Sequence, residues 1–397
     1  MSSPEFDRRR LLRWASLAGV AAVVPAGCRP APSVEEQPPD APMRFPGKVA
    51  MRVVNDRPPC LETPWEYFRR ELTPVEAFYV RWHLQVIPTA IDTRTWRLRV
   101  GGAVHKPLEL SLDEIRRMPA TSIVAVNQCS GNSRGLFTPK VPGSQWGNGA
   151  MGNAKWTGVP LRDILDKAGL GAKALEVSFQ GLDRGGAAGV PDYVKTLPID
   201  KARDSHVLLA YAMNDQPLPL LNGFPLRVVV PGYYATYWVK ALEQINVLTS
   251  PFSGFWMNPG YRIPPTPNGN ERPDALSKVT IPINRVNVRS FFTMPMGRVA
   301  MNTSTELQGF AFDGGDGIRS VEISEDGKTW TAATLGADLG GFSFRRWRLE
   351  WRPSTPGTAS LQVRATSKSG ETQPTAEGWN RSGYMRNVVE RITLDVV

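Results

Sequence analysis

Short apolar and alternating runs recur along the chain from residue 96 to residue 247, and each predicts a β-strand because successive strand side chains face opposite sides. Turns rich in Gly, Pro, Asn and Asp separate these runs. The predicted strands are Trp96–Val100, Ile123–Val126, Leu175–Phe179, Val207–Ala212, Leu226–Val230 and Trp238–Val247.

Two segments between these strands predict short helices. Ser111–Met118 begins with a capping box, in which Ser111 and Glu114 each bond the backbone of the other. Pro160–Ala168 has proline in its first turn and ends at Gly169, an arrangement typical of helices. This order of elements predicts an α+β domain around a mixed sheet. The sequence contains no G-x-G-x-x-G motif and no P-loop, so a Rossmann repeat is not expected.

The pattern changes after a Pro- and Gly-rich stretch at residues 251–285. Short alternating segments then follow one another, separated by Gly, Asp and Pro turns, which is typical of a β-sandwich. The clearest of these segments are Val321–Ile323, Trp347–Trp351 and Leu361–Ala365. We therefore expect an α+β domain at residues 48–279 and an all-β domain at residues 280–397.

The N-terminus predicts export. Consecutive arginines at positions 8–10 precede a short apolar stretch, as in twin-arginine signals, and Pro25 argues against a membrane-spanning helix. Residues 1–28 are therefore predicted to be a Tat-type signal that sends a folded protein to the periplasm. The end of this segment resembles a lipoprotein signal, so a membrane tether through lipidated Cys28 is an alternative. Residues 29–47 are rich in Pro and Glu and predict a flexible tether.

Composition narrows the class of protein. The chain has 397 residues, which favours two domains, and a net charge of +10. Because Lys and Arg are scattered, nucleic-acid binding is not expected, whereas an anionic substrate or an acidic partner is compatible with the charge. Only three Cys are present, and we expect no structural disulfide, with Cys60 as a partly buried free thiol.

Cys129 is the strongest candidate for chemistry. It follows the apolar run Ile123–Val126 and precedes Gly131 and Asn132, which both tolerate left-handed backbone. A cysteine there is held by a strand and can face a cleft, and the nearby Arg134 favours a thiolate. A small buried core residue is the alternative interpretation. The polar flank favours a thiolate nucleophile or a metal ligand.

Several separated motifs, in order, resemble the sulfite oxidase family of molybdenum enzymes. The resemblance runs from about Phe78 to the C-terminus and is most similar to the bacterial sulfite dehydrogenase catalytic subunits. It implies an immunoglobulin-like C-terminal domain of the dimerisation type. The motifs are Asn127–Arg134, Gly147–Leu161, Leu209–Asn214, Asn222–Gly232, Asp313–Gly315 and Trp379–Asn380.

The resemblance implies a catalytic site around a single molybdopterin with molybdenum. Cys129 matches the thiolate ligand of the metal. Arg81 and His83 match active-site residues, and because they are two positions apart on an extended segment, they can face the cofactor together. Tyr261 matches the active-site tyrosine, and Arg134 matches an arginine that binds substrate or organises the pocket. From the residues alone, Arg81 as a solvated strand residue and His83 as a structural histidine would be the simpler interpretation.

Four further residues are implied as cofactor contacts. The pterin carries a phosphate, which needs donors and positive charge. Arg227 and Lys240 match basic contacts, and Asp183 offers an acceptor for pterin N–H groups. Asn222 stands where the family commonly has a histidine.

The implied activity is oxidation of sulfite to sulfate by oxygen-atom transfer, with single electrons passed to a c-type cytochrome or a haem c subunit. The sequence has no Cys-x-x-Cys-His motif, so haem is expected on another polypeptide, in a heterodimer or beside a homodimer. A sulfane dehydrogenase acting on carrier-bound sulfur and a methionine-sulfoxide reductase are the enzyme alternatives. An Ig-like scaffold protein is the non-enzyme alternative, and it leaves the Cys129 region unexplained.

Overall fold

Strands make up most of the regular structure in this computed structural model, which describes residues 45–397. The predicted twin-arginine segment, Cys28 and most of the predicted tether lie outside these residues. The described part contains six sheets and only three short α-helices, so it is richer in strands than the α+β prediction suggested. None of the helices in this part is long and apolar enough to cross a membrane. The helices are α1 (Leu112–Arg116), α2 (Leu161–Ala168) and α3 (Ile199–Ala202).

The caps predicted for the two longer helices are present, although α1 ends at Arg116, before the predicted Met118. In α1, the Ser111 side chain accepts from the Glu114 backbone and the Glu114 side chain bonds the Ser111 backbone, which completes the capping box. In α2, Pro160 occupies the N-cap and Gly169 the C-cap, with a φ of 67° that suits glycine. Helix α2 buries one face, formed by Leu161, Ile164, Leu165 and Ala168, against the core.

One five-stranded sheet is mixed, as predicted, with the order β5-β4-β13-β8-β9. Strands β4 and β13 run parallel, whereas the other pairs are antiparallel. The predicted strand Trp238–Val247 was too long: β13 begins only at Leu242, because Ala241 has a left-handed φ of 44° that interrupts the extended backbone. The strands are β4 (Leu98–Gly102), β5 (Leu108–Leu110), β8 (Glu176–Gly181), β9 (Val194–Pro198) and β13 (Leu242–Leu248).

A second sheet carries the Cys129 segment. Its order is β11-β10-β7-β6, and β12 also pairs with β10. The pairing of β6 with β7 runs through Gln128 opposite Met151, and Cys129 N–H continues it by donating to Ala150 O at 2.9 Å. The ladder therefore fixes the cysteine at the end of a buried strand. The strands are β6 (Thr121–Gln128), β7 (Met151–Pro160), β10 (Leu208–Met213), β11 (Gln216–Pro217) and β12 (Arg227–Val229).

Two small sheets and several 3₁₀ turns connect these layers. A three-stranded sheet has the order β1-β2-β3, and β14 pairs with β15. The strands are β1 (Arg52–Asn55), β2 (Cys60–Glu62), β3 (Val80–Arg81), β14 (Arg262–Ile263) and β15 (Ile281–Pro282). The 3₁₀ turns are Trp65–Arg69, Val75–Ala77, Arg134–Leu136, Leu220–Asn222, Ala235–Tyr237 and Pro267–Gly269.

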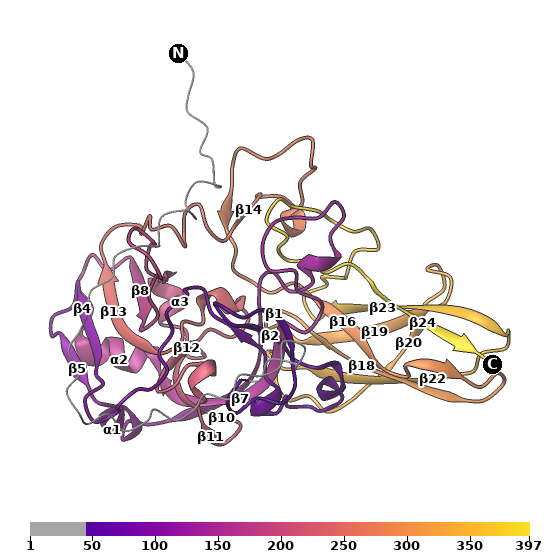
Figure 1. Ribbon diagram of the computed structural model, residues 1–397, viewed down its shortest axis with the longest axis horizontal. Coiled ribbons are helices and arrows are strands. Elements are labelled where there is room, and N and C mark those ends of the chain that lie inside the picture. Colours follow the sequence, from indigo (N-terminus) through magenta and orange to yellow (C-terminus); the bar gives the residue numbers. More distant parts are fainter. Residues whose placement is uncertain (1–44) are drawn as a thin grey trace, which may run out of the picture. The chain divides into compact units, whose positions relative to one another are not determined.

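Two further sheets form a β-sandwich from the C-terminal part of the chain, and their strands lie together in Figure 1. Their orders are β16-β18-β22-β21 and β17-β24-β23-β19-β20, and both sheets contribute to one apolar cluster. The immunoglobulin-like topology and the domain boundary at residue 280 stay predictions. The strands are β16 (Arg289–Met294), β17 (Gly297–Val299), β18 (Thr305–Phe312), β19 (Ile318–Ser324), β20 (Thr331–Ala332), β21 (Thr334–Leu335), β22 (Arg345–Trp351), β23 (Gly357–Ser367) and β24 (Glu390–Val396).

The sandwich packs directly on the rest of the protein. Phe68, in a 3₁₀ turn near the N-terminus, stacks on Phe310 of β18 at 5.4 Å, and Trp65 meets Phe291 of β16 edge-on at 5.7 Å. Such aromatic pairs contribute roughly 0.5–1.5 kcal/mol beyond their buried area. The sandwich is therefore joined by core packing to the domain that carries Cys129.

Candidate active site

The loop that presents Cys129 turns tightly after β6. Cys129 O accepts from Asn132 N–H at 3.0 Å, and Cys129 itself is only 6% exposed. The sequence suggested left-handed backbone at Gly131 or Asn132, but the structure places it at Ser133, with a φ of 70°. Gly131 is needed for another reason: a Cβ there would lie 2.6 Å from the Arg134 guanidinium. The guanidinium therefore packs against the back of the Cys129 loop.

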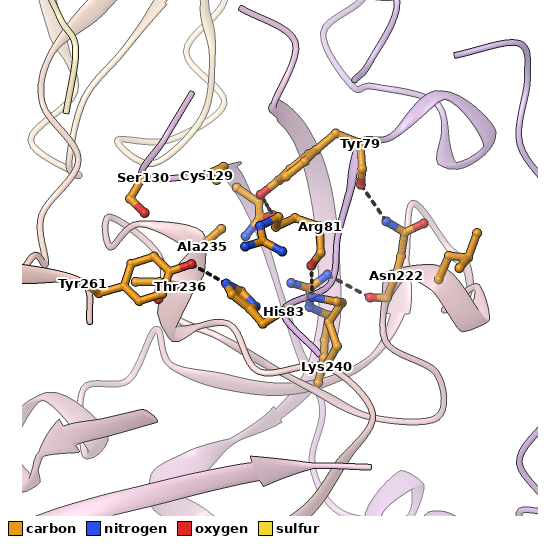
Figure 2. A pocket seen from close by; sticks show the side chains of 13 residues that line it. Tyr79, Arg81, His83, Cys129, Ser130, Asn222, Ala235, Thr236, Lys240 and Tyr261 are labelled. Atoms are coloured by element: carbon orange, nitrogen blue, oxygen red, sulfur yellow. Dashed lines mark hydrogen bonds between the residues drawn. The ribbon is translucent and has the colours of Figure 1, made fainter. Parts of the chain in front are cut away.

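Cys129 lines a pocket together with residues from five other segments (Figure 2). Seven of the nine predicted site residues meet there, although they lie far apart in the sequence. Arg134 and Asp183 are not among the lining residues. The lining consists of Tyr79, Arg81, His83, Asn127, Cys129, Ser130, Leu221, Asn222, Arg227, Ala235, Thr236, Lys240 and Tyr261.

His83 and Tyr261 point toward each other in the pocket, with the Tyr261 hydroxyl 2.5 Å from His83 Nε2 (Figure 2). The imidazole also stacks on Tyr193 at 3.8 Å. Burial, followed by the positive charges of Arg81 and Lys240, holds the pKa of His83 well below its usual range. Burial raises the pKa of Tyr261 above its usual value. At neutral pH both groups are therefore uncharged, and they share one hydrogen bond in the pocket.

Three cationic side chains, Arg81, Arg227 and Lys240, converge on the same space. Lys240 Nζ donates to Arg81 O at 2.6 Å, and burial together with the charge of Arg227 lowers its pKa to about 7. Arg227 is only 3% exposed and donates to Asn222 O at 2.8 Å and Trp238 O at 3.2 Å. No carboxylate lines the pocket, so its positive charge has no counterion among the lining residues.

Several polar atoms of the lining residues have no hydrogen-bond partner within residues 45–397. They are the buried atoms Arg227 Nε, Asn127 Nδ2 and Ser130 Oγ. Buried polar groups are almost always hydrogen-bonded, so these atoms indicate a ligand rich in acceptors. In residues 45–397 no three His, Cys, Asp or Glu side chains gather to hold a metal, so a metal at Cys129 takes its other ligands from a cofactor. A thiol, unpaired cations and free donors fit a molybdopterin carrying a phosphate.

Both polar atoms of the Asn222 side-chain amide are hydrogen-bonded. Its Oδ1 accepts from Lys48 Nζ at 2.6 Å, and its Nδ2 donates to Tyr79 O at 3.1 Å. Lys48 also donates to Val75 O and Phe78 O. Asn222 thus joins two walls of the pocket, and its predicted contact with the pterin stays a prediction.

The two predicted residues outside the lining lie close behind it. Arg134 donates from Nε to Ser382 O at 3.1 Å and lies over the Tyr384 ring at 5.1 Å. This arrangement suits organising the pocket better than binding substrate. Asp183 is 4% exposed, and burial raises its pKa to about 6, while the positive charge of Lys240 acts in the opposite direction.

The structure adds residues that the sequence had not singled out. Asn127 and Ser130 flank Cys129 in the quoted motif, and Tyr79 O–H donates to Asn127 Oδ1 at 2.6 Å. Lys195 had no motif around it: it is fully buried in β9, donates to Trp256 O at 2.7 Å, and its Nζ lies 5.0 Å from the Tyr261 ring centre. Only the three-dimensional contact identifies such a residue.

Cys60 is a free thiol, as expected, but it is fully and not partly buried; Cys129 is also free. Cys60 Sγ lies 3.9 Å from Ser144 Oγ, and Cys60 pairs with Arg81 across strands β2 and β3. Burial raises the pKa of the Cys60 thiol. Cys60 therefore supports the strand that carries Arg81 and is not itself part of the lining.

Comparison with known proteins shows which family has this arrangement. Residues 83–256 match the family described as an oxidoreductase molybdopterin binding domain, and residues 280–397 match the Mo-co oxidoreductase dimerisation domain. The mitochondrial sulfite oxidase of Mus musculus is 32% identical over 388 residues, covering 92% of this chain and 69% of that protein. The sulfite oxidase of Gallus gallus is 32% identical, covering 91% of this chain and 81% of that protein.

A solved structure shares the fold. The crystal structure of the sulfane dehydrogenase SoxCD from Paracoccus pantotrophus superimposes with a TM-score of 0.72 at 24% identity, over 84% of each chain. The family domains, the identity to sulfite oxidases and the pocket around Cys129 agree with one another. The chain belongs to the sulfite oxidase family of molybdenum oxidoreductases.

Proposed function

We propose that this enzyme oxidises sulfite to sulfate and passes the electrons one at a time to a c-type cytochrome. The observation that carries the proposal is the set of three cations beside the buried Cys129 thiol, with no carboxylate among the lining residues. Sulfite is a small anion, and such a pocket favours it over neutral substrates. The sulfite oxidases of Mus musculus and Gallus gallus provide the second line of support.

The cofactor would lie between Cys129 and the cations of the pocket. Cys129 would supply the one protein thiolate to the metal, and Arg227 and Lys240 would bind the phosphate of the pterin, with Asn127 and Ser130 as neighbouring donors. When bound, molybdenum-molybdopterin supplies two-electron oxygen-atom transfer chemistry. Asp183 is not among the lining residues, and its predicted role as an acceptor for pterin N–H groups stays a prediction.

Arg81, His83 and Tyr261 would act on the substrate. The Arg81 guanidinium would bind and orient sulfite, because it is a permanent cation with several donors. Neutral His83, protonated on Nε2, would donate to the Tyr261 oxygen through their 2.5 Å contact, which leaves the phenol proton to donate a hydrogen bond to a substrate oxygen. Tyr193 stacks on His83 and Trp256 meets it edge-on, so these rings would shield the pair from water.

The electron acceptor would be a c-type cytochrome or a haem c subunit on another polypeptide, and the chain itself would carry no haem. The twin-arginine sequence supports a periplasmic location, with attachment through Cys28 as the alternative. The match of residues 280–397 to a dimerisation domain supports either a homodimer or a heterodimer with the haem subunit.

Sulfane oxidation on a carrier protein is the second candidate, because the fold matches the sulfane dehydrogenase SoxCD. The two activities differ in the size of the substrate: free sulfite needs only the pocket, whereas carrier-bound sulfur also needs a docking surface around it. Identity to sulfite oxidases over more than nine-tenths of the chain favours free sulfite.

A sulfite-dependent cytochrome c reduction assay tests the proposal on the holoenzyme isolated after export. We expect turnover with sulfite, and little with thiosulfate or methionine sulfoxide. Cys129→Ser is the matched control, because it keeps the size of the side chain while replacing the thiolate, and it should remove turnover without unfolding the protein. Comparable turnover of wild type and Cys129→Ser, or preference for another substrate, would overturn the proposal.

A further inference from the structure

We infer that Tyr384, from the loop that precedes β24, is a positioning residue that holds Tyr261 against His83 and joins both to the Cys129 loop. The inference rests on the proposed function only where it concerns sulfite. It assigns a role in the active site to the C-terminal part of the chain, which the family match describes only as a dimerisation domain.

Tyr384 lies between two residues that the site uses. Its ring stacks on the Tyr261 ring with centres 5.4 Å apart and planes 8° apart. The Arg134 guanidinium lies 5.1 Å from the centre of the same Tyr384 ring. Offset stacking and a cation on an aromatic face are both favourable geometries. One aromatic side chain therefore connects the segment after Cys129 with the catalytic tyrosine.

Hydrogen bonds and a neighbouring glycine fix the backbone that carries the Tyr384 ring. Asn380 is only 1% exposed, and its amide brackets Tyr384: Oδ1 accepts from Tyr384 N–H at 3.0 Å, and Nδ2 donates to Tyr384 O at 2.8 Å. Gly383 has a φ of 59°, and a Cβ there would lie 2.8 Å from Arg134 Cγ. The motif residue Asn380 thus acts on the position of Tyr384 and not on the pocket itself.

The same loop is fastened to the Cys129 loop at two other points. Met385 N–H donates to Ser130 O at 3.0 Å, next to Cys129, and Ser382 O accepts from Arg134 Nε at 3.1 Å. Earlier in the C-terminal part, Arg289 of β16 donates to Ser133 Oγ at 3.1 Å and to Glu390 at 2.6 Å. The connection is therefore distributed over several contacts, and Tyr384 is the member that reaches Tyr261.

Tyr261 has an unfavourable backbone conformation, so the position of its ring depends on the side chains packed around it. It has a left-handed φ of 56°, which is uncommon for a bulky residue, and it lies in a Pro- and Gly-rich loop. The hydroxyl must nevertheless stay within 2.5 Å of His83 Nε2. Removing the Tyr384 ring leaves the Tyr261 ring free to tilt, and misplacement by about 1 Å costs up to a hundredfold in rate.

The test compares Tyr384→Leu, which removes the ring, with Tyr384→Phe, which keeps it. We expect the leucine variant to lose roughly tenfold or more in kcat/KM for sulfite, and the phenylalanine variant to restore it to within about twofold. Phe292→Leu is the control for general destabilisation, because Phe292 packs on Trp347 inside the sandwich and should leave the kinetics unchanged. If Tyr384→Leu does not fold, Tyr384→Met fills the same space without a ring.

Two readouts separate positioning from simple stability. In a double-mutant cycle with Tyr261→Phe, the loss caused by Tyr384→Leu should shrink, because the hydroxyl it positions is already absent. Crystal structures of wild type and Tyr384→Leu should show the Tyr261 ring displaced from His83. Additive effects in the cycle, or an unmoved Tyr261 in the variant crystal, would overturn the inference. The crystal comparison holds even if sulfite is not the substrate, so it distinguishes failure of this inference from failure of the proposed function.

Discussion

Two buried arginines in this protein differ in whether a carboxylate faces them. Arg289, fully buried where β16 begins, donates to the Glu390 carboxylate at 2.6 Å, and Arg386 donates to the same oxygen at 3.0 Å. Arg227, only 3% exposed in the pocket, bonds two backbone carbonyls and forms no ion pair within residues 45–397. Both arginines lose most of their hydration, but only Arg289 has a carboxylate in return.

The arginine without a carboxylate indicates where the protein binds an anionic ligand. An isolated buried charge is costly, and proteins usually pair it. Arg289 is paired internally because it serves the structure. Arg227 is left unpaired next to Lys240 and Arg81, around the Cys129 thiol, and burial lowers its pKa to about 10. A phosphate-bearing cofactor and an anionic substrate supply the missing charge.

Replacing each arginine by methionine gives the sharpest form of this comparison. Arg227→Met should remove most of the bound molybdenum and pterin while changing the unfolding free energy of the cofactor-free protein by no more than about 1 kcal/mol. Arg289→Met should destabilise the protein by about 1.5–3 kcal/mol, because Glu390 loses its shorter charge-assisted hydrogen bond and keeps only the one from Arg386. Metal analysis, pterin fluorescence and urea unfolding of both variants measure these effects. Full cofactor loading of Arg227→Met would break the comparison.

Arg81→Met tests the substrate side of the unpaired region. Removing this cation should raise the KM for sulfite by roughly tenfold or more, because a hydrogen bond to a charged group contributes about 1.5–3 kcal/mol. The effect should fall as ionic strength rises, since salt screens the remaining attraction. Arg99→Met, at a surface ion pair with Glu243, is the matched control and should leave KM unchanged. Steady-state kinetics at several salt concentrations decide the outcome, and an unchanged KM would place Arg81 outside substrate binding.

Tyr261→Phe tests the uncharged pair formed by His83 and Tyr261. The ring and its stacking on Tyr384 should persist, so stability should change by less than about 1 kcal/mol. Loss of the hydroxyl should lower kcat/KM by about tenfold, the value expected for one hydrogen bond made at the reacting centre. Steady-state kinetics together with Mo(V) electron paramagnetic resonance over a range of pH provide the measurement. Matching rates and spectra would refute a role for the hydroxyl.

Lys195 is a further buried cation that forms no ion pair in the described part of the chain. Its effect is expected on the unfolding free energy of the cofactor-free protein. Burial lowers its pKa from 10.5 to about 7. The unfolded chain therefore binds more protons than the folded one above pH 7, and stability should rise with pH. Above pH 9 this rise should be opposed by groups such as Cys60, whose pKa burial raises above 9.0.

Lys195→Met should reduce this slope, by up to about 1.4 kcal/mol for each pH unit. A smaller slope remains, because burial also lowers the pKa of Lys48 and Lys240 to about 7. Urea unfolding of the cofactor-free wild type and variant at pH 7 and pH 9 measures the difference. Equal slopes for the two proteins would show that Lys195 stays charged in the folded state.

Much of the fold was readable from the sequence, because periodicity and caps are local signals. The capping box at Ser111 and the stop at Gly169 depend on neighbouring residues alone. Strand β13 was predicted too long, since a single left-handed residue, Ala241, is not marked by composition. The left-handed position in the Cys129 loop was likewise misplaced, from Gly131 or Asn132 to Ser133.

The site residues also fall into those predicted from the sequence and those found only in the structure. Seven residues matched by family motifs do meet in one pocket, whereas Arg134 faces Tyr384 behind the loop. Lys195 and Tyr384 could not be found from the sequence, because their importance comes from which ring each one contacts across the fold. Local patterns predict elements, while contacts between distant segments need the structure.

The most direct test of the central claim is molybdenum-edge X-ray absorption of the holoprotein, compared between wild type and Cys129→Ser. The claim is that the pocket with unpaired cations holds molybdenum-molybdopterin, and that Cys129 is the protein ligand of the metal. The account predicts molybdenum in both proteins, with one sulfur neighbour fewer in the variant. Identical sulfur coordination in the two proteins would contradict it.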